Sequence, residues 1–384
     1  MLHIFEARLP KLLSLPKVLT LSTLVALTLS AHSPAAFATG NTLRPTGSAD
    51  AQSKYVGILE TIEQAKARRN TPTTGDLAAN VVQNSFLDPN ERHPIDAFSM
   101  LQEAPAGAYV AVGTERCFMM AVLLNQITRL VCIDRDPQVV LYNMVNTALL
   151  KLSSSRQNYL NLRLNEHASI WQSKAKMAPH LSVDEKALLS DDRAFAFWHK
   201  KIRNEKRFAA FHTPSPDTAE RYPYGRANYL FEDSGYARLA ALAKEDAIQS
   251  DLVQLSDDLD LIKIFADLDK RATQISVVDI SNAWWKNYGG IKNLSTVAEL
   301  LVRRNDLQAR VVYTTWINKT GNFAGWSYGG ADIQSISHPK DFTQFLNYMA
   351  RLERRATLFS LKPEEANRLN SFKYIEGCRE LLQP

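Results

Sequence analysis

The stretch that decides the fold runs from Ala108 to Leu152 and reads AYVAVGTERCFMMAVLLNQITRLVCIDRDPQVVLYNMVNTALLKL. It begins with a continuous apolar run of strand length that ends at Gly113, and a segment of helical composition follows. A second apolar strand, residues 130–133, ends in Asp134, and Pro137 opens another amphipathic helix. The order strand, glycine turn, helix, strand, helix predicts parallel strands joined by right-handed crossovers.

The same alternation resumes in the second half of the chain. Short apolar strands are expected at 247–249, 275–278 and 309–313, with helices at 236–244, 259–270 and 294–304. Five strands alternating with helices predict a doubly wound α/β domain around a mostly parallel sheet. Residues 153–228 interrupt the order with polar, Arg- and Lys-rich sequence, and we expect a helical insertion that lies over one end of the sheet, in the position of a substrate lid.

The N-terminal residues have the pattern of an export signal. Residues 1–38 combine three basic residues, an apolar run at 18–29 and small residues before Thr39, which predicts a secretory signal peptide. The apolar run is shorter than the roughly 20 residues that a membrane span needs, which favours a cleaved signal peptide. An uncleaved anchor is the alternative interpretation. We therefore expect a periplasmic or secreted protein with a polar leader and N-terminal helices at 39–95 and the α/β domain at 96–384.

The composition excludes several classes of protein. The 384 residues carry 45 Lys and Arg against 40 Asp and Glu, and a net charge of +5 is too mild to imply a nucleic-acid partner. Three cysteines cannot form a disulfide framework. The eight histidines show no metal-ligand spacing and there is no Cys-x-x-Cys motif, so no metal site is expected. No second apolar run reaches the length of a membrane span.

Polar residues follow the predicted strands at the places where such sheets bind ligands. Ligands of open α/β sheets lie beyond the carboxyl ends of the strands, where the strand order reverses. Gly113 follows the first strand, Asp134 the second, Asp251 the third, and Asp279-Ile280-Ser281-Asn282 the fourth. Asp134 lies 21 residues beyond Gly113 (134 − 113), the spacing at which a carboxylate binds vicinal ribose hydroxyls. This pattern predicts a nucleotide ligand.

Each of these polar residues also has a purely structural interpretation. Asp134, or Asp136 in its place, is able to cap the helix that Pro137 opens. Ser281 or Asn282 is able to cap the helix that follows the fourth strand.

Together the motifs resemble those of class I S-adenosylmethionine-dependent methyltransferases, over roughly residues 96–150 and 229–350. The Gly-Thr-Glu-Arg loop with the Asp-x-Ser-Asn motif resembles an exported branch of that superfamily. The resemblance implies a Rossmann-like methyltransferase fold that binds S-adenosylmethionine or S-adenosylhomocysteine. By the resemblance, the cofactor-binding residues are Gly113, Thr114, Glu115, Arg116, Asp134, Asp251, Asp279 and Ser281. Asp279 and Asn282 are the candidate catalytic residues at the acceptor side, and Trp284 and Trp285 are placed to shield the pocket from water.

The loop departs from the pattern of that superfamily in one respect. It carries a single glycine, and Glu115 and Arg116 bring bulk and charge to the place of the methionine part of the cofactor. We therefore retain three functions. The first is methyl transfer to an unknown acceptor, and the second is non-catalytic binding or surface recognition on a methyltransferase-like scaffold. The third is an NAD-linked oxidoreductase, which has less support because the three-glycine pyrophosphate motif is missing.

Three further segments bear on the acceptor. A basic run, Lys200, Lys201, Arg203, Lys206 and Arg207, suits either an anionic acceptor or a solvated helix face. Residues 222–230 are aromatic and amide-rich and suit either an acceptor pocket or core packing. Residues 316–330 are rich in glycine and aromatic residues and predict a mobile loop after the fifth strand.

Overall fold

The computed structural model describes residues 54–69, 101–164, 166–204, 228–285, 288–318 and 324–356. The predicted signal peptide, residues 1–38, lies outside the described residues, as do residues 39–53 of the predicted leader. In the part of the chain that is described, no helix is both long and apolar enough to cross a membrane.

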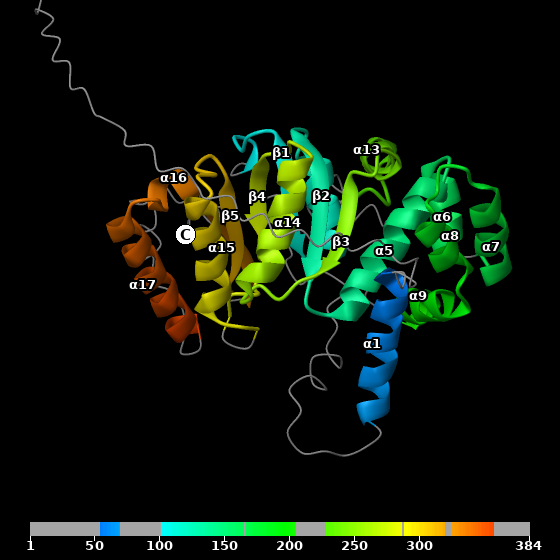
Figure 1. Cartoon of the computed structure of the whole chain (residues 1–384), viewed down its shortest axis with the longest axis horizontal. Coiled ribbons are helices and arrows are strands. Elements are labelled where there is room, and N and C mark those ends of the chain that lie inside the picture. Colours follow the sequence, from blue (N-terminus) through cyan, green and yellow to red (C-terminus); the bar gives the residue numbers. More distant parts are fainter. Residues whose placement is uncertain are drawn as a thin grey trace, which may run out of the picture. The chain divides into compact units, whose positions relative to one another are not determined.

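Six strands form a single mixed sheet (Figure 1). They are β1 (Gly107–Val112), β2 (Ile127–Asp134), β3 (Ile248–Leu252), β4 (Ile275–Asp279), β5 (Arg310–Asn318) and β6 (Ala324–Asp332), in the order β3-β2-β1-β4-β5-β6. The first five strands are parallel and β6 is antiparallel to β5. The predicted α/β architecture with a mostly parallel sheet is therefore confirmed. The strand order reverses between β1 and β4.

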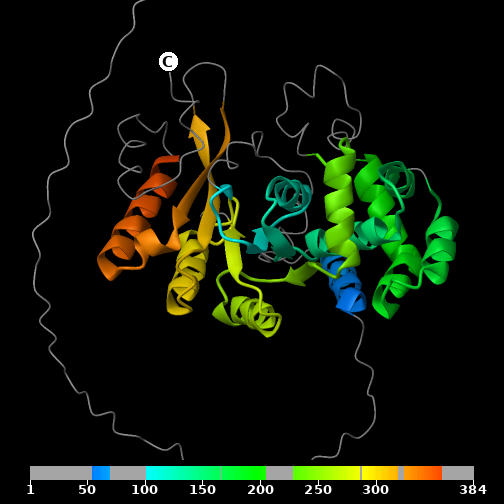
Figure 2. The same cartoon turned by 90° about the horizontal axis from the view of Figure 1, so that it is seen from above.

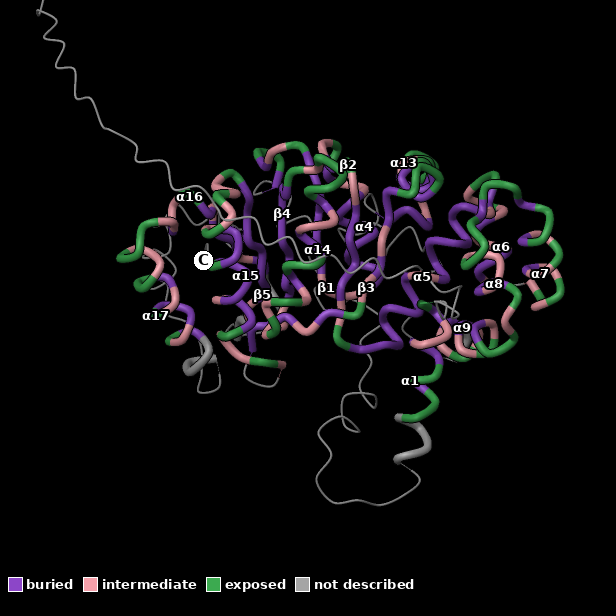
Figure 3. The backbone as a smooth tube through the Cα atoms, in the orientation of Figure 1, coloured by how far each residue is buried: buried purple, intermediate pink, exposed green. Residues whose placement is uncertain are grey.

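The central strands are buried on both faces because the chain covers each face with helices. Tyr109 and Ala111 of β1 belong to one hydrophobic core, whereas Ala108 and Val110 belong to the other. This alternation explains why β1 reads as a continuous apolar run rather than an alternating one. In Figure 3 the buried colour follows the central strands, and the exposed colour is concentrated on the outer surfaces of the helices.

The helices divide between the two faces of the sheet, as Figure 2 shows. One face carries α4 (Glu115–Leu123), α5 (Pro137–Leu152) and α13 (Asp233–Lys244), with α1 (Lys54–Arg69) packed against α5. The opposite face carries α14 (Asp258–Lys270), α15 (Ile291–Arg303), α16 (Ile333–Ile336) and α17 (Pro339–Ala356).

The interruption between α5 and α13 is helical, as the sequence predicts. It contains α6 (Arg156–Leu164), α7 (Ala168–Met177), α8 (Val183–Ser190) and α9 (Asp192–Asn204), and residues 205–227 lie outside the described part. The main contacts of α6, α8 and α9 with the rest of the domain are to α5. In both views these helices lie beside the β3 edge of the sheet (Figures 1 and 2), so the described helices are not a lid over its end.

The prediction of a loop at 316–330 is wrong, because most of this stretch forms the β5–β6 hairpin. The glycines of its described part, Gly325, Gly329 and Gly330, are residues of β6. Gly329 pairs with Tyr313 across the hairpin, and a Cβ atom on Gly329 would lie 2.7 Å from the Tyr313 ring. Glycine at this position therefore makes room for a cross-strand aromatic ring, a use of glycine that composition alone does not distinguish from a loop.

Candidate functional site at the strand-order reversal

The structure brings the predicted site loops to one edge of the sheet. Ala111 of β1 pairs with Asp279 of β4, and the neighbouring Val112 pairs with Ile133 of β2. The amide of Gly113 donates a hydrogen bond to the carbonyl of Ile133 (3.3 Å). The loops after β1, β2 and β4 therefore meet at the point where the strand order reverses, which is the usual ligand position of such sheets.

Gly113 has a backbone conformation that favours glycine. Its φ is +109°, in the region that residues with a Cβ atom rarely adopt. A Cβ atom there would meet nothing closer than the Cys117 sulfur at 4.0 Å, so conformation rather than crowding requires glycine. The Asn143 side chain of α5 donates a hydrogen bond to the Gly113 carbonyl (2.8 Å) and so fixes the turn to this helix. Thr114 is buried at the N-cap position of α4, although its side chain makes no capping hydrogen bond.

Asp134 is a half-buried carboxyl at the end of β2, and its environment perturbs it. Its Oδ1 accepts from the Asp136 amide (2.9 Å). Burial raises the pKa of Asp134 to about 7; the Asp136 amide opposes that rise, and the Asp136 charge adds to it. Asp136, not Asp134, caps α5, because its side chain accepts from the Gln138 amide (2.8 Å) ahead of Pro137 at the start of the helix. The ribose assignment of Asp134 stays a prediction, and its capping alternative is wrong.

Glu115 lies at the centre of a buried polar cluster that joins the insertion to the site loop. Its Oε1 accepts from Arg163 of α6 (2.6 Å) and from the Tyr142 hydroxyl of α5. Its Oε2 accepts from the Tyr229 hydroxyl (2.7 Å), which lies where the chain returns from the insertion. Burial and the Glu115 charge keep the pKa of Tyr229 well above its ordinary value, so this phenol remains a donor. Glu115 is 1% exposed.

Arg163, the partner of Glu115, is enclosed by aromatic rings. Its guanidinium also donates to the Tyr159 hydroxyl (2.8 Å) and to Oδ1 of Asn146 (3.0 Å). It lies 5.2 Å from the centre of the Trp198 ring, and that ring stacks on Tyr142 at 4.8 Å. Tyr229 and Trp198 are thus core residues of this cluster, which supports the packing interpretation of this part of the insertion.

Arg116, the next residue, pairs with Asp279 at the end of β4. Asp279 is 0% exposed, and its Oδ2 accepts from both Arg116 and the Tyr109 hydroxyl (2.6 Å). Its Oδ1 accepts from the Ser281 amide (2.9 Å). Arg116 also donates to the Val112 carbonyl (2.9 Å). Both oxygens of the Asp279 carboxylate are therefore engaged inside the protein, where they tie the loop after β4 to the first turn of α4.

The loop after β4 continues as a turn rather than a helix. Ser281 is buried with φ +50°, and its carbonyl accepts from the Thr314 amide (2.8 Å). The next helix, α15, begins only at Ile291 with Gly290 as its cap, so the capping alternative for Ser281 and Asn282 is wrong. Asn282 is half-buried at the turn, and its catalytic role stays a prediction.

The tryptophans that follow are largely built into the core. Trp284 is fully buried, and its indole donates to the Thr314 carbonyl (2.8 Å). Its ring packs edge-on against Tyr313 at 5.8 Å and tilts against Trp285 at 5.4 Å. Trp284 therefore supports the loop from the α15 side of the sheet instead of covering a pocket.

Asp251 is engaged at a distance from the reversal. It lies on the edge strand β3, accepts from Gln249 (2.7 Å), and forms an ion pair with Lys54 of α1. Lys54 also donates to the Ser250 carbonyl, so α1 is fastened to the β3 edge. The structure thus places Asp251 near the carboxyl end of β3 but already paired, and its cofactor-binding role stays a prediction.

The structure adds two polar groups that the sequence analysis missed. Asn143 Oδ1 and Thr314 Oγ1 are fully buried, and neither has a hydrogen-bond partner among the described residues. Asn143 lies beneath Gly113, and Thr314 adjoins Ser281. The available signal for Asn143 was an asparagine among the mostly apolar residues of this helix. Thr314 carried no such signal, because threonine is ordinary in a strand.

The remaining predicted features are only partly described. Lys200 and Lys201 lie on α9, whereas Lys206 and Arg207 fall outside the described residues. Among the described residues, no three His, Cys, Asp or Glu side chains gather closely enough to hold a metal ion.

The comparisons with known proteins place the chain in a family without assigning a ligand. No curated protein matches the chain. Residues 86–359, more than half of the chain, match a family described as a domain of unknown function (DUF7790). The matched segment contains every element of the sheet, the insertion and the site loops. The chain therefore belongs to the DUF7790 family.

Proposed function

We propose that this chain is an exported protein that binds S-adenosylmethionine or S-adenosylhomocysteine on a Rossmann-like, methyltransferase-type fold. The strand order β3-β2-β1-β4-β5-β6 supports the proposal, since it is the order of Rossmann sheets, which bind their ligand at the β1/β4 reversal. The antiparallel direction of β6 is a departure from an all-parallel sheet. It lies at the far edge, two strands away from the reversal.

The observation that carries the proposal is the state of Asp134. Asp134 is half-buried at the end of β2, beside Gly113, and burial raises its pKa to about 7. It does not cap α5, because Asp136 does so. Keeping a carboxyl in such a place costs stability unless a ligand supplies donors. Two vicinal ribose hydroxyls are donors of the right kind, and the spacing from Gly113 agrees with that use.

The residues of the loop fit an adenosyl ligand better than their charges indicate. Glu115 and Arg116 are 1% and 3% exposed, and each charge is paired inside the protein, Glu115 with Arg163 and Arg116 with Asp279. The Glu115 carboxylate is therefore held in the cluster with Arg163, whereas the Arg116 guanidinium stays against the loop, where it donates to the Val112 carbonyl. The unpartnered oxygens of Asn143 and Thr314 flank the same two loops and would accept hydrogen bonds from a ligand that reached them.

Binding has more support than catalysis. Methyl transfer requires an acceptor held in line with the sulfonium, and a carboxylate that orients the acceptor must be able to touch it. Asp279 is fully buried with both oxygens engaged, which favours a positioning role for it. This observation gives weight to the second candidate function, a non-catalytic binder or recognition protein. The single glycine of the loop continues to disfavour NAD.

Calorimetry at pH 8 tests the proposal directly. The purified protein is titrated with S-adenosylmethionine, S-adenosylhomocysteine and NAD, alongside Asp134→Ala. We expect the two adenosyl compounds to bind and NAD not to bind. Asp134→Ala removes hydrogen bonds to a charged acceptor worth roughly 1.5–3 kcal/mol each and should weaken binding at least tenfold. Absence of adenosyl binding at millimolar ligand, or preference for NAD, would reject the proposal.

A second measurement divides catalyst from binder. Release of S-adenosylhomocysteine is followed with amine, hydroxyl and phosphorylated acceptors, in wild type and in Asn282→Ala. Turnover that Asn282→Ala abolishes without loss of cofactor affinity supports methyl transfer. Tight binding without turnover on any acceptor supports the binder.

A further inference from the structure

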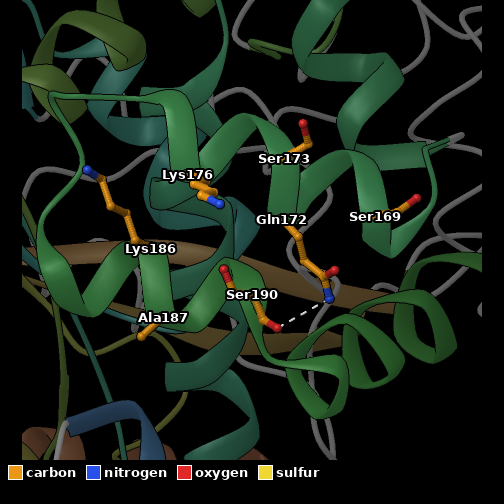
Figure 4. Close-up of a pocket in the computed structure, with 7 residues that line it drawn as sticks. All are labelled: Ser169, Gln172, Ser173, Lys176, Lys186, Ala187 and Ser190. Carbon is orange, nitrogen blue, oxygen red and sulfur yellow. Dashed lines mark hydrogen bonds between the residues drawn. The ribbon is translucent and has the colours of Figure 1, made fainter.

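A donor-rich groove lies on the insertion, between α7 and α8 (Figure 4). Its lining is Ser169, Gln172, Ser173 and Lys176 from α7, and Lys186, Ala187 and Ser190 from α8. These residues recur at intervals of three and four, so each set occupies one face of its helix. The opposite faces hold the helices to the insertion core through the buried residues Trp171, Ala175, Leu188 and Leu189.

The groove presents positive charge that the protein does not neutralise. Among the described residues, no carboxylate forms an ion pair with Lys176 or Lys186. Of the neighbouring acids, Glu185 pairs with Lys151, Asp191 pairs with Arg193, and Asp192 accepts from the Gln172 amide. Asp184, in the first turn of α8, is exposed and forms no ion pair with either lysine. Three serine hydroxyls complete the lining. Two free ammonium groups and three hydroxyls are donors suited to an oxyanion.

The same end of the helix pair exposes apolar side chains. Met177 and Val183 are 72% and 84% exposed. No other large apolar side chain among the described residues has a higher exposed fraction. Met177 lies four positions after Ser173, and Val183 lies three positions before Lys186, so both extend the groove-lining faces. Between them Ala178 and Leu181 are buried, so the connection that carries these side chains is anchored.

This juxtaposition selects a lipid surface over a small anion. A free phosphate or sulfate would use the lysines and hydroxyls but would gain nothing from two exposed apolar side chains. An anionic membrane surface uses both, because apolar side chains enter the boundary of headgroups and acyl chains while lysines contact the phosphates. Lysine stems also reach from an apolar contact to a polar headgroup.

We propose that the α7–α8 tip is a peripheral docking site for anionic phospholipid. Met177 and Val183 enter the lipid interface, and Lys176, Lys186 and the serine hydroxyls contact headgroup phosphates. The site is distinct from the strand-order reversal and does not depend on adenosyl binding.

Vesicle co-sedimentation tests the docking site. The full chain is mixed with phosphatidylcholine vesicles prepared with and without phosphatidylglycerol, at low and at raised salt. Two double variants are compared with wild type: Lys176→Glu/Lys186→Glu and Met177→Ser/Val183→Ser. All comparisons use the same chain, so any contribution from the N-terminal apolar run cancels. We expect wild type to bind the anionic vesicles more tightly than the neutral ones, and more tightly at low than at raised salt. The partition coefficient of each double variant on anionic vesicles should be lower by roughly tenfold or more.

Matched controls separate docking from general charge and hydrophobicity. Lys270→Glu/Lys292→Glu makes the same charge change on exposed positions of α14 and α15, and Leu259→Ser removes a 64% exposed apolar side chain of α14. Both controls should bind vesicles like wild type, and all variants should keep the wild-type melting temperature. Equal losses in the controls, binding that ignores phosphatidylglycerol, or binding of inorganic phosphate without vesicle binding would overturn the proposal.

Discussion

The raised pKa of Asp134 makes adenosyl binding depend on pH. Ribose hydroxyls donate to the ionised carboxylate, and a group with a pKa of about 7 is ionised in roughly one molecule in eleven at pH 6 and ten in eleven at pH 8. If the ionised form is the one that binds, affinity should rise about tenfold between pH 6 and pH 8 and level off above that. In Asp134→Asn, affinity should be low and nearly independent of pH over the same interval.

The same residue should influence stability in the opposite sense. Its pKa in the folded protein lies above the ordinary value of 3.8, so the folded state keeps a proton that the unfolded state has released. The free energy of unfolding should therefore fall as pH rises from about 4 to about 7 and then remain level. At 1.36 kcal/mol per pKa unit the upper limit is about 4 kcal/mol, and half-burial reduces the expected loss to about 1–2 kcal/mol. Asp134→Asn should recover that amount above pH 7.

Two assays in the same buffers check this reasoning. Calorimetry at pH 6, 7 and 8 gives the affinities, and urea denaturation at the same pH values gives the free energies of unfolding. Asp257→Asn is the matched control, since Asp257 caps α14 on the other face of the sheet and asparagine caps helices equally well. A wild-type affinity that does not change with pH, or an equal pH slope in Asp134→Asn, would refute the assignment of the ribose carboxylate to this residue.

Four further perturbations have expected outcomes. Arg163→Met leaves the buried Glu115 carboxylate without its cation and should cost about 3–5 kcal/mol in urea denaturation, and adding Glu115→Gln should restore part of that loss. Asp136→Ala removes the α5 cap and should lower the free energy of unfolding by about 1 kcal/mol while adenosyl binding persists. Asp279→Asn weakens the pair with Arg116, so the melting temperature should fall while the affinity for the adenosyl ligand stays close to that of wild type. Unchanged stability with lost turnover would instead assign Asp279 to catalysis. The chain expressed in a bacterial host with residues 1–38 should be recovered outside the cytoplasm beginning near Thr39, and mass spectrometry that finds an intact Met1 in membranes would favour the anchor.

The fold was predictable wherever one signal acted alone. The short, continuous apolar run before Gly113 predicts a buried parallel strand, and so do the runs at 130–133 and 275–278. The strand β6 was missed because its glycines are read as loop residues, whereas Gly329 is needed for contact with the Tyr313 ring. A local pattern does not reveal a partner that arrives from another strand.

The site was predictable in position and only partly in role. Strand ends are local features, so Gly113, Asp134 and Asp279 were found from sequence. The partners of the charged residues were not local. Glu115 pairs with a residue 48 positions away and Arg116 with one 163 positions away, so their burial could not be inferred from the loop itself. The choice between Asp134 and Asp136 as the helix cap depended on one hydrogen bond, from the Gln138 amide to the Asp136 carboxylate, which the sequence does not reveal.

The pairing of β1 with β4 has a consequence for how the chain folds. Ala111 and Asp279 are neighbours in the sheet but lie 168 residues apart (279 − 111), so the centre of the sheet is a highly non-local contact. Such contacts form slowly because the entropy of closing a long loop is lost before the contacts contribute any stabilising free energy. The β1–β2–β3 half is able to assemble first, with one edge of β1 open until β4 arrives. That open edge is the segment most exposed to misassociation while the chain folds, and a chaperone that covered it would protect the chain.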